Sequence, residues 1–318
     1  MMTFRRTIFY TFMVLMLSSM ALAQNRFSIE QLKEKTYDGF NFIIATDLGR
    51  NGYYDQKYIG NTMGEVAGEC DAEFVAASGD VFHYLGVQSV QDPLFISNFE
   101  NVYPHPELQI PWYPILGNHE YHGNTQAVID YSQISRRWEM PSRYYVKHFE
   151  LDNDELLDIF FIDTCPLIDK YVNDSEYPDA AKQNRSAQLK WLEEQLSKSK
   201  AHNKIVIGHH PIYADTSKNV SERLDMQKHI DPLLRKYGVN LYSAGHIHNF
   251  QHIKMPSSDV NYMVVSSGSL SRNVAPIEGT QFCNSNTGFA FVSVKDGKIN
   301  VYFLDKDANI LYEFVANK

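Results

Sequence analysis

The sequence predicts an α/β protein arranged as a four-layer α/β/β/α sandwich with two central mixed β-sheets. Apolar runs typical of buried strands alternate with amphipathic helical segments over most of the chain. Near the C-terminus, strand-like runs follow one another directly, and the Asp-Gly turn within Val294–Lys298 is typical of an antiparallel hairpin. This order of elements favours helical layers that cover paired sheets.

Each expected strand is rich in β-branched or aromatic residues. Five precede His248 and stop at glycine or polar residues: Phe42–Thr46, Phe74–Ser78, Pro111–Leu116, Lys204–Ile207 and Val239–Ala244. Four more follow it: Tyr262–Ser267, Phe289–Val294, Lys298–Leu304 and Ile310–Val315. Helices are expected at Tyr54–Cys70, Gln126–Trp138, Ala187–Lys198 and Leu224–Tyr237. The polar segment Pro166–Arg185 is expected to be a surface loop and a candidate lid.

Side chains that can bind metal ions follow directly after the first five strands. They lie in Asp47-Leu48-Gly49, Gly79-Asp80, Gly117-Asn118-His119-Glu120, Gly208-His209-His210-Pro211 and Gly245-His246-Ile247-His248. In α/β folds, ligands bind beyond the carboxyl ends of the strands, so these segments are expected to meet. Carboxylate, amide and imidazole suit divalent first-row ions, Fe(III) and zinc. A carboxylate such as Asp80 can bridge two ions about 3.5–4 Å apart. The sequence therefore predicts a dinuclear metal site.

The order of these motifs resembles that of the calcineurin-like metallophosphoesterases, and more closely that of the purple (tartrate-resistant) acid phosphatases. The segments Gln126–Tyr145, Gln188–Leu192 and His248–Gln251 also resemble that branch. The resemblance implies that Asp80 bridges two metals, iron with zinc, manganese or a second iron. It implies the following remaining ligands: Asp47 and His248 for the first metal, and Asn118, His209 and His246 for the second. His119 would face the substrate without binding metal.

One departure from the family concerns the first metal. The family places a tyrosine ligand three residues after the bridging aspartate, where this chain has His83, followed by Tyr84. A tyrosinate favours Fe(III) and gives these enzymes their colour. With His83 as the ligand, we expect a colourless enzyme that prefers divalent iron, manganese or zinc and has a neutral or alkaline pH optimum. A shifted register would make Tyr84 the ligand instead.

A second departure concerns the loop after His209, where the family usually has another substrate-facing histidine. Residues 214–226 contain none. Lys218 is a candidate to bind the substrate phosphate as a point charge, and His210 is a candidate to replace the missing imidazole in catalysis. Glu120 is expected to orient His119 or a metal ligand.

These residues suggest a phosphatase that hydrolyses phosphate monoesters by attack of a metal-bound hydroxide, with His119 assisting the leaving oxygen. A phosphodiesterase or nucleotide hydrolase with the same metal centre is the alternative. A non-catalytic phosphate-binding or metal-binding protein is a third possibility. It is disfavoured because all the histidine ligands are intact.

The N-terminus resembles a secretory signal peptide. Arg5 and Arg6 precede the apolar stretch Thr7–Leu17 and an Ala21-Leu22-Ala23 cleavage pattern. We therefore expect a signal at residues 1–23, one catalytic domain at residues 24–318, and a secreted or periplasmic protein without a membrane anchor after cleavage. Cleavage removes two arginines and no acidic residue, so the formal net charge changes from −9 to −11. Binding to a nucleic-acid backbone is disfavoured by this charge. The expected partners are small phosphorylated substrates, and a monomer is favoured.

Overall fold

The computed structural model describes residues 26–216 and 220–317 of the 318-residue chain. The expected signal at residues 1–23 and the candidate phosphate ligand Lys218 lie outside these ranges. A helix covers residues 26–36 at the start of the described part. No helix in the described ranges is both long enough and apolar enough to span a membrane.

The first sheet has six strands in the order β13-β12-β11-β1-β2-β3. Strands β1 (Phe40–Ala45), β2 (Ala72–Ala77) and β3 (Trp112–Pro114) run parallel to one another. Strands β11 (Gly288–Lys295), β12 (Lys298–Asp305) and β13 (Ile310–Val315) continue the sheet as an antiparallel meander, and β11 pairs with β1. The expected C-terminal hairpin is therefore present.

The second sheet has seven strands in the order β10-β8-β9-β7-β6-β5-β4. Its parallel centre consists of β5 (Leu156–Phe161), β6 (Asn203–Ile207), β7 (Leu241–Ala244) and β9 (Asn261–Val264). Antiparallel strands β4 (Tyr145–Glu150), β8 (Phe250–Ile253) and β10 (Thr280–Asn284) complete it. Both sheets are mixed, as expected.

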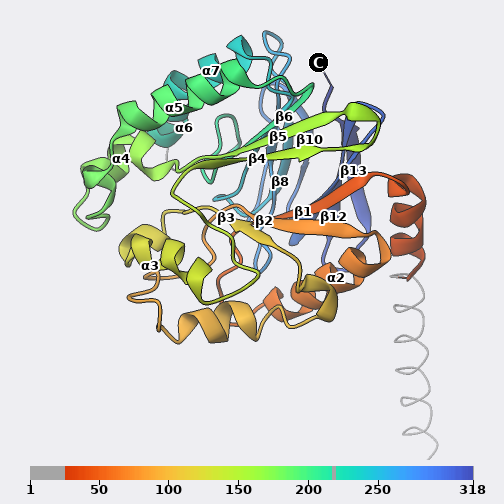
Figure 1. The fold of residues 1–318 in the computed structure, drawn as a ribbon, viewed down its shortest axis with the longest axis horizontal. Coiled ribbons are helices and arrows are strands. Elements are labelled where there is room, and N and C mark those ends of the chain that lie inside the picture. The colour runs from red at the N-terminus through yellow and green to blue at the C-terminus, as the bar shows by residue number, and fades with distance from the viewer. Residues whose placement is uncertain (1–25, 217–219, 318) are drawn as a thin grey trace, which may run out of the picture.

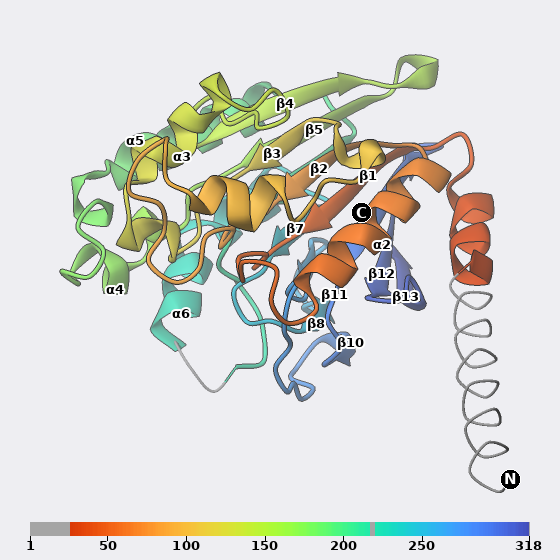
Figure 2. The same cartoon turned by 90° about the horizontal axis from the view of Figure 1, so that it is seen from below.

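Helices cover the outer faces of both sheets. Figures 1 and 2 show α2 (Gln56–Glu69) and α3 (Thr125–Asp130) beside the first sheet. The other outer layer contains α4 (Asp169–Val172), α5 (Arg185–Lys198), α6 (Val220–His229) and α7 (Asp231–Lys236). The expected α/β/β/α sandwich is confirmed.

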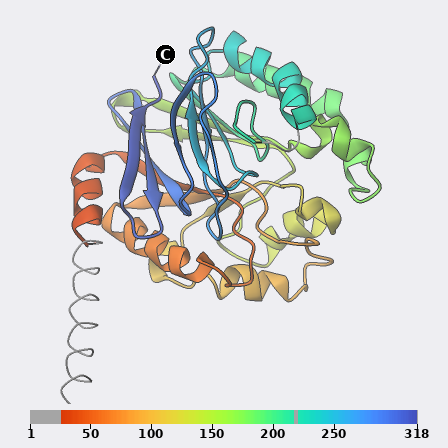
Figure 3. The ribbon, with the colours of Figure 1, turned by 180° about the vertical axis from the view of Figure 1, so that it is seen from behind.

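Aromatic side chains join the two sheets at their inner faces. Phe74 of the first sheet stacks on Phe149 of the second, with ring centroids 5.3 Å apart. Phe250 and Phe303 make a similar contact at 4.8 Å between the C-terminal strands, which Figure 3 shows side by side from behind. Such pairs combine burial of large apolar surfaces with specific geometry, so they fix one sheet against the other.

Several elements differ from the sequence-based expectation. The helix expected at Leu224–Tyr237 is divided into α6 and α7, because Pro232 lies at the start of α7 and cannot continue a preceding helix. The helix expected at Gln126–Trp138 ends at Asp130 and continues as a short 3-10 turn. The segment Pro166–Arg185 was expected to be a loop but contains α4 and two 3-10 turns. Strands β4, β5, β8 and β10 were not expected.

Candidate metal centre

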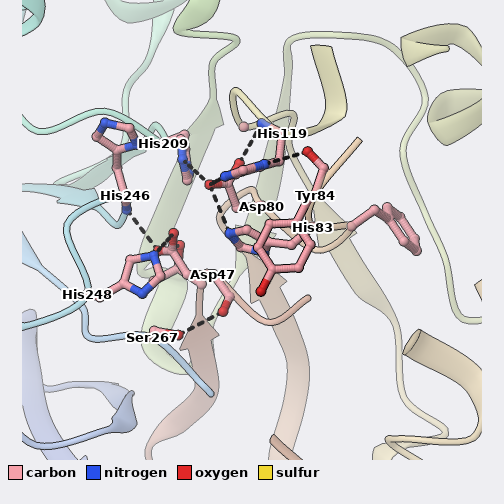
Figure 4. A network of polar contacts seen from close by, with 12 residues as sticks. Asp47, Asp80, His83, Tyr84, His119, His209, His246, His248 and Ser267 are labelled. Carbon is pink, nitrogen blue, oxygen red and sulfur yellow. Dashed lines mark hydrogen bonds and ion pairs between the residues drawn. The ribbon is translucent and has the colours of Figure 1, made fainter. Parts of the chain in front are cut away.

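The ends of five parallel strands bring the five predicted ligand segments together. Asp47 follows β1, Asp80 follows β2 and Asn118 follows β3 in the first sheet, while His209 follows β6 and His246 follows β7 in the second. Figure 4 shows Asp47, Asp80, His209 and His248 around one site. The site therefore lies where both sheets present the carboxyl ends of their parallel strands, as the sequence predicts.

The carboxylate of Asp80 is at the centre of the site. Its Oδ2 atom lies 3.2 Å from His209 Nε2, 3.6 Å from His83 Nε2 and 4.0 Å from His119 Nε2. Its Oδ1 atom accepts a hydrogen bond of 2.9 Å from the backbone N–H of His119. Burial opposes the charge of Asp80, but the neighbouring imidazoles of His209, His119 and His83 hold the pKa well below its usual range. Asp80 is therefore an anion with imidazoles on several sides.

Asp47 forms a second centre beside the first. Its Oδ1 atom lies 3.2 Å from His248 Nε2. Its Oδ2 atom accepts hydrogen bonds from Thr46 Oγ1 at 2.9 Å and from the backbone N–H of His246 at 2.8 Å. Ser267 Oγ donates to the Asp47 carbonyl at 2.8 Å. Burial disfavours the charged carboxylate, but His248 and His209 lower its pKa overall.

Ligand-atom distances define overlapping groups that contain these residues. Ligand atoms within each group lie within 4.8 Å of one another, and the groups are Asp47–His83–His248, Asp80–His83–His119, Asp47–Asp80–His209 and His209–His210–His246. Since Asp47, Asp80, His83 and His209 each belong to more than one group, the groups form one continuous site.

The backbone of the site is held in an uncommon conformation. Asp47, Asp80, His246 and His248 have φ angles of 51°, 54°, 71° and 59°. Non-glycine residues rarely adopt this left-handed region, and each costs on the order of 1 kcal/mol or more unless the surroundings enforce it. Gly117 allows close packing here, because a Cβ atom at that position would collide with the Asp80 carboxylate.

His83, rather than Tyr84, faces Asp80. The His83 side chain is 1% exposed, whereas Tyr84 is 60% exposed. Burial lowers the pKa of His83 to about 3, despite the opposing effect of Asp80, so its imidazole is neutral near pH 7. The Arg50 guanidinium lies over the Tyr84 ring, 4.8 Å from its centroid. This geometry supports His83 as the residue that takes the place of the family tyrosine.

The donor set fits metal ions. Five buried atoms at the site have no hydrogen-bond partner among the described residues: Asp47 Oδ1, Nδ1 and Nε2 of His83, Asn118 Oδ1 and His209 Nε2. Two of them have only an ion-pair neighbour, at 3.2 Å: His248 for Asp47 Oδ1 and Asp80 for His209 Nε2. Buried polar atoms are nearly always satisfied, so a converging group of exceptions calls for a binding partner. All five belong to the predicted ligands, and carboxylate, amide and imidazole suit the divalent ions expected from the sequence.

His119 and Glu120 have different roles at the end of β3. His119 Nδ1 donates a 2.7 Å hydrogen bond to the Tyr84 carbonyl, which leaves Nε2 on the Asp80 side, and its side chain is 24% exposed. Glu120 is buried and accepts hydrogen bonds from the backbone N–H groups of Asp80, Phe82 and Gly117. Glu120 therefore orients the backbone of Asp80, while the His119 ring is oriented by a carbonyl.

The structure corrects our expectation that His210 faces the substrate. His210 is completely buried. Its Nδ1 lies 2.7 Å from Thr164 Oγ1, and its Nε2 lies 2.9 Å from the Tyr171 hydroxyl. Since both ring nitrogens have partners, neither is available to a substrate in this arrangement.

Sequence reasoning missed Glu222, which lies in the first turn of α6. Its Oε2 atom lies 3.1 Å from His246 Nε2, and its side chain is 2% exposed. The sequence offered no signal for this contact, because Glu222 belongs to a helix with many charged residues and to no ligand motif.

Comparisons with known proteins agree with the geometry. The family model described as calcineurin-like phosphoesterase matches residues 40–250. Purple acid phosphatase 3 of Arabidopsis thaliana is 33% identical over 294 residues, which cover 88% of this chain and 78% of that protein. Tartrate-resistant acid phosphatase type 5 of Homo sapiens is 32% identical over 260 residues, with coverage of 76% and 78%.

Solved structures show the same fold. GAP50 of Plasmodium, described as the anchor in the inner membrane complex, has a TM-score of 0.73 and 24% identity, with 87% of this chain and 88% of that chain covered. Purple acid phosphatase PPD1 from yellow lupin (Lupinus luteus) has a TM-score of 0.62 and 15% identity, with 86% and 53% covered. The chain therefore belongs to the calcineurin-like phosphoesterases and, among them, to the purple acid phosphatases, a family of metal-dependent phosphatases.

Proposed function

We propose that this protein is a secreted phosphomonoesterase that works with two metal ions. The observation that carries this proposal is the position of Asp80, whose Oδ2 atom faces His209 at 3.2 Å and His83 at 3.6 Å. One carboxylate thus has candidate ligands on two sides, as a bridge between two ions requires. Asp80 would hold the first ion with Asp47, His83 and His248, and the second with Asn118, His209 and His246.

In the proposed reaction, the metal ions and the protein side chains have separate roles. When bound, the two ions supply Lewis-acid polarisation of the phosphoryl group and an activated water as the nucleophile. His119 would supply the acid in its imidazolium form: Nδ1 donates to the Tyr84 carbonyl, and the hydrogen on Nε2 is the proton that would pass to the leaving oxygen. Asp47 and Asp80 contribute about −2 against about +4 from two divalent ions, which leaves a positive site for a phosphate in an acidic protein.

The neutral His83 ring decides the proposed metal preference. Since burial lowers its pKa to about 3, it binds as a neutral donor. A tyrosinate at this position would add a negative charge and favour Fe(III). We therefore expect divalent iron, manganese or zinc at the first position, and a neutral or alkaline pH optimum.

The proposed location follows from the N-terminal sequence. Removal of residues 1–23 would leave a mature chain that begins at Gln24 with a net charge of −11. Small phosphorylated compounds, rather than nucleic-acid backbones, suit such a protein as substrates. N-terminal sequencing of protein secreted by its own host checks the cleavage site.

Hydrolysis of two model substrates tests the proposed activity. We expect turnover of p-nitrophenyl phosphate, slower turnover of its bis-ester, and loss of both after treatment with a chelator. Asp80→Asn should abolish turnover, because it removes the shared carboxylate. Asp231→Asn is the matched control: Asp231 is a buried carboxylate of α7 that contacts Tyr213, Tyr262 and Arg235.

Two results would contradict the proposal. If the bis-ester is cleaved while turnover of the monoester is undetectable, the protein is a phosphodiesterase. If metal-loaded protein cleaves neither substrate, the phosphatase fold serves a non-catalytic role in this protein. Such an outcome is possible because a fold alone does not fix an activity.

A further inference from the structure

Glu222 connects the α-helical layer to the candidate metal centre. It lies in α6, and its carboxylate has three partners among the described residues. Oε1 accepts hydrogen bonds from the Tyr171 hydroxyl at 2.8 Å and from Lys170 Nζ at 2.9 Å. Oε2 lies 3.1 Å from His246 Nε2. A carboxylate that is 2% exposed is costly to bury without such partners.

The contact with Glu222 selects one tautomer of His246. An ionised carboxylate can only accept a hydrogen bond, so Nε2 of His246 must carry the hydrogen. The other oxygen of Glu222 already accepts from the Lys170 ammonium group at 2.9 Å and from the Tyr171 hydroxyl at 2.8 Å, which is the arrangement of an ionised carboxylate. Nδ1 is then the ring nitrogen of His246 that has a lone pair for a metal ion.

The position of His246 is fixed from two directions. Its backbone N–H donates to Asp47 Oδ2 at 2.8 Å, and Figure 4 shows its ring pointing away from Asp47. Glu222 holds the far end of the ring. The His246 ring lies beside His209, with ring centroids 5.2 Å apart. One nitrogen from each of these two rings and one from His210 form a group in which all ligand atoms lie within 4.8 Å.

A directed series of hydrogen bonds continues from Glu222 into the neighbouring layer. The Tyr171 hydroxyl donates to Glu222, so it can accept from His210 Nε2 at 2.9 Å. Thr164 Oγ1 can then donate to His210 Nδ1 at 2.7 Å. Each group has a compatible donor or acceptor role, so His210 supports Glu222 through Tyr171.

We propose that Glu222 is a positioning residue for the second metal: it holds His246 in the tautomer with hydrogen on Nε2 and reserves Nδ1 for the ion. This inference rests on the ligand set of the proposed function. Carboxylates that bind the free N–H of a metal-bound histidine typically change metal affinity 10-fold to 100-fold when they are removed. Glu222 should therefore affect the site that contains His246 and leave the other site unchanged.

Zinc binding to folded protein tests this role without an activity assay. Glu222→Ala should lower the zinc affinity of one of the two sites by about 10-fold to 100-fold. The affinity is measured by elemental analysis after dialysis against buffered free zinc. Glu222→Gln should recover only part of the affinity, because its amide oxygen can accept from Nε2 only when its NH₂ group faces the donors Lys170 and Tyr171. Asp231→Asn is again the matched control. It should lower stability while both zinc affinities remain at the wild-type values.

A spectroscopic measurement on the wild-type protein gives an independent result. With ¹⁵N-labelled histidine and zinc bound, His246 should show a protonated Nε2 and a metal-bound Nδ1. The opposite tautomer would overturn the inference even if Glu222→Ala fails to fold. Equal zinc affinities for wild type and a folded Glu222→Ala variant would also overturn it and leave the proposed function intact. Wild-type protein that binds fewer than two zinc ions would instead overturn both.

Discussion

Replacement of Glu120 should destabilise the protein because its carboxylate holds three backbone groups beside the metal centre. Oε2 accepts from the N–H groups of Asp80 at 3.0 Å and Gly117 at 2.6 Å, and Oε1 accepts from Phe82 at 2.9 Å. Glu120 is 1% exposed, so water cannot replace these bonds without a rearrangement. The carboxylate thus fixes the loops after β2 and β3 relative to each other.

The magnitude follows from the number of bonds. Glu120→Gln keeps the size of the side chain and one oxygen, so its NH₂ group must face at least one backbone N–H. A hydrogen bond to a charged group contributes about 1.5–3 kcal/mol. Burial and the neighbouring Asp80 raise the pKa of Glu120, which means that they disfavour its charge. Removal of the charge therefore offsets part of the free energy lost with the hydrogen bond. We expect a net loss of about 2 kcal/mol for Glu120→Gln and about 4 kcal/mol for Glu120→Ala.

Urea unfolding at pH 7 in the presence of a chelator measures this loss without a contribution from bound metal. Glu69→Gln is the control, because Glu69 is 60% exposed and forms a surface ion pair with Lys33. Such a pair contributes at most about 1 kcal/mol. If Glu120→Gln unfolds within about 0.5 kcal/mol of wild type, the three hydrogen bonds do not stabilise the loops, and the reasoning is refuted.

Three further predictions concern other residues. His83→Tyr should introduce a visible charge-transfer band in the iron-loaded protein and shift the pH optimum downward; an unchanged spectrum and optimum would reject our account of His83. His119→Asn should lower kcat by about 10²-fold to 10⁴-fold with zinc binding unchanged, as judged by steady-state kinetics and elemental analysis; a change only in KM would contradict its role as an acid. Burial raises the pKa of Asp163 from 3.8 to about 7, so its contribution to stability is complete below about pH 4 and is lost as the pH rises through 7. This loss is on the order of 4 kcal/mol, and Asp163→Asn should flatten the dependence of unfolding free energy on pH between 4 and 7.

The clustering of the candidate ligands was predictable because their segments follow strands directly. A buried apolar run followed by glycine and a carboxylate or imidazole places that side chain at a sheet edge, whatever the details of packing. Asp47, Asp80, His209 and His248 accordingly lie together in the structure. The two-sheet architecture was predictable for a similar reason, because the order of strands and helices is itself a local pattern.

The helix expected at Gln126–Trp138 shows where such patterns fail. Its apolar residues have helical spacing, but in the structure they are buried by contacts that a single continuous helix does not make. Tyr131 stacks on Phe95 with ring centroids 3.7 Å apart, and Trp138 Nε1 donates to the Val128 carbonyl at 2.8 Å. The segment bends back on itself, since Val128 lies only 10 residues before Trp138, and Tyr131 packs on a residue that lies 36 positions earlier. Periodicity reports burial on one face but does not identify the partner.

His210 was assigned to the substrate because it is adjacent to His209 in sequence. Adjacent residues at the end of a strand point in opposite directions. His209 therefore reaches Asp80, while His210 turns toward Thr164 and Tyr171 in the helical layer. The unexpected strand β5 has an apolar run, Leu156–Phe161, which was a usable signal. Glu222 gave no such signal.

The candidate ligands are held in place by other residues, two of which lie outside the five motifs. Ligands follow strands, where four of them adopt a left-handed backbone conformation at a cost on the order of 1 kcal/mol or more each. Other residues hold them there: Glu120, at the end of the third motif, binds the Asp80 backbone, while Ser267 and Glu222, outside the motifs, bind the Asp47 carbonyl and the His246 ring. The five motifs grafted onto another sheet would therefore lack the contacts from Ser267 and Glu222. Since mutation of Glu120 or Glu222 leaves every motif ligand in place, weaker metal binding in either variant would show that the site depends on this second set of residues.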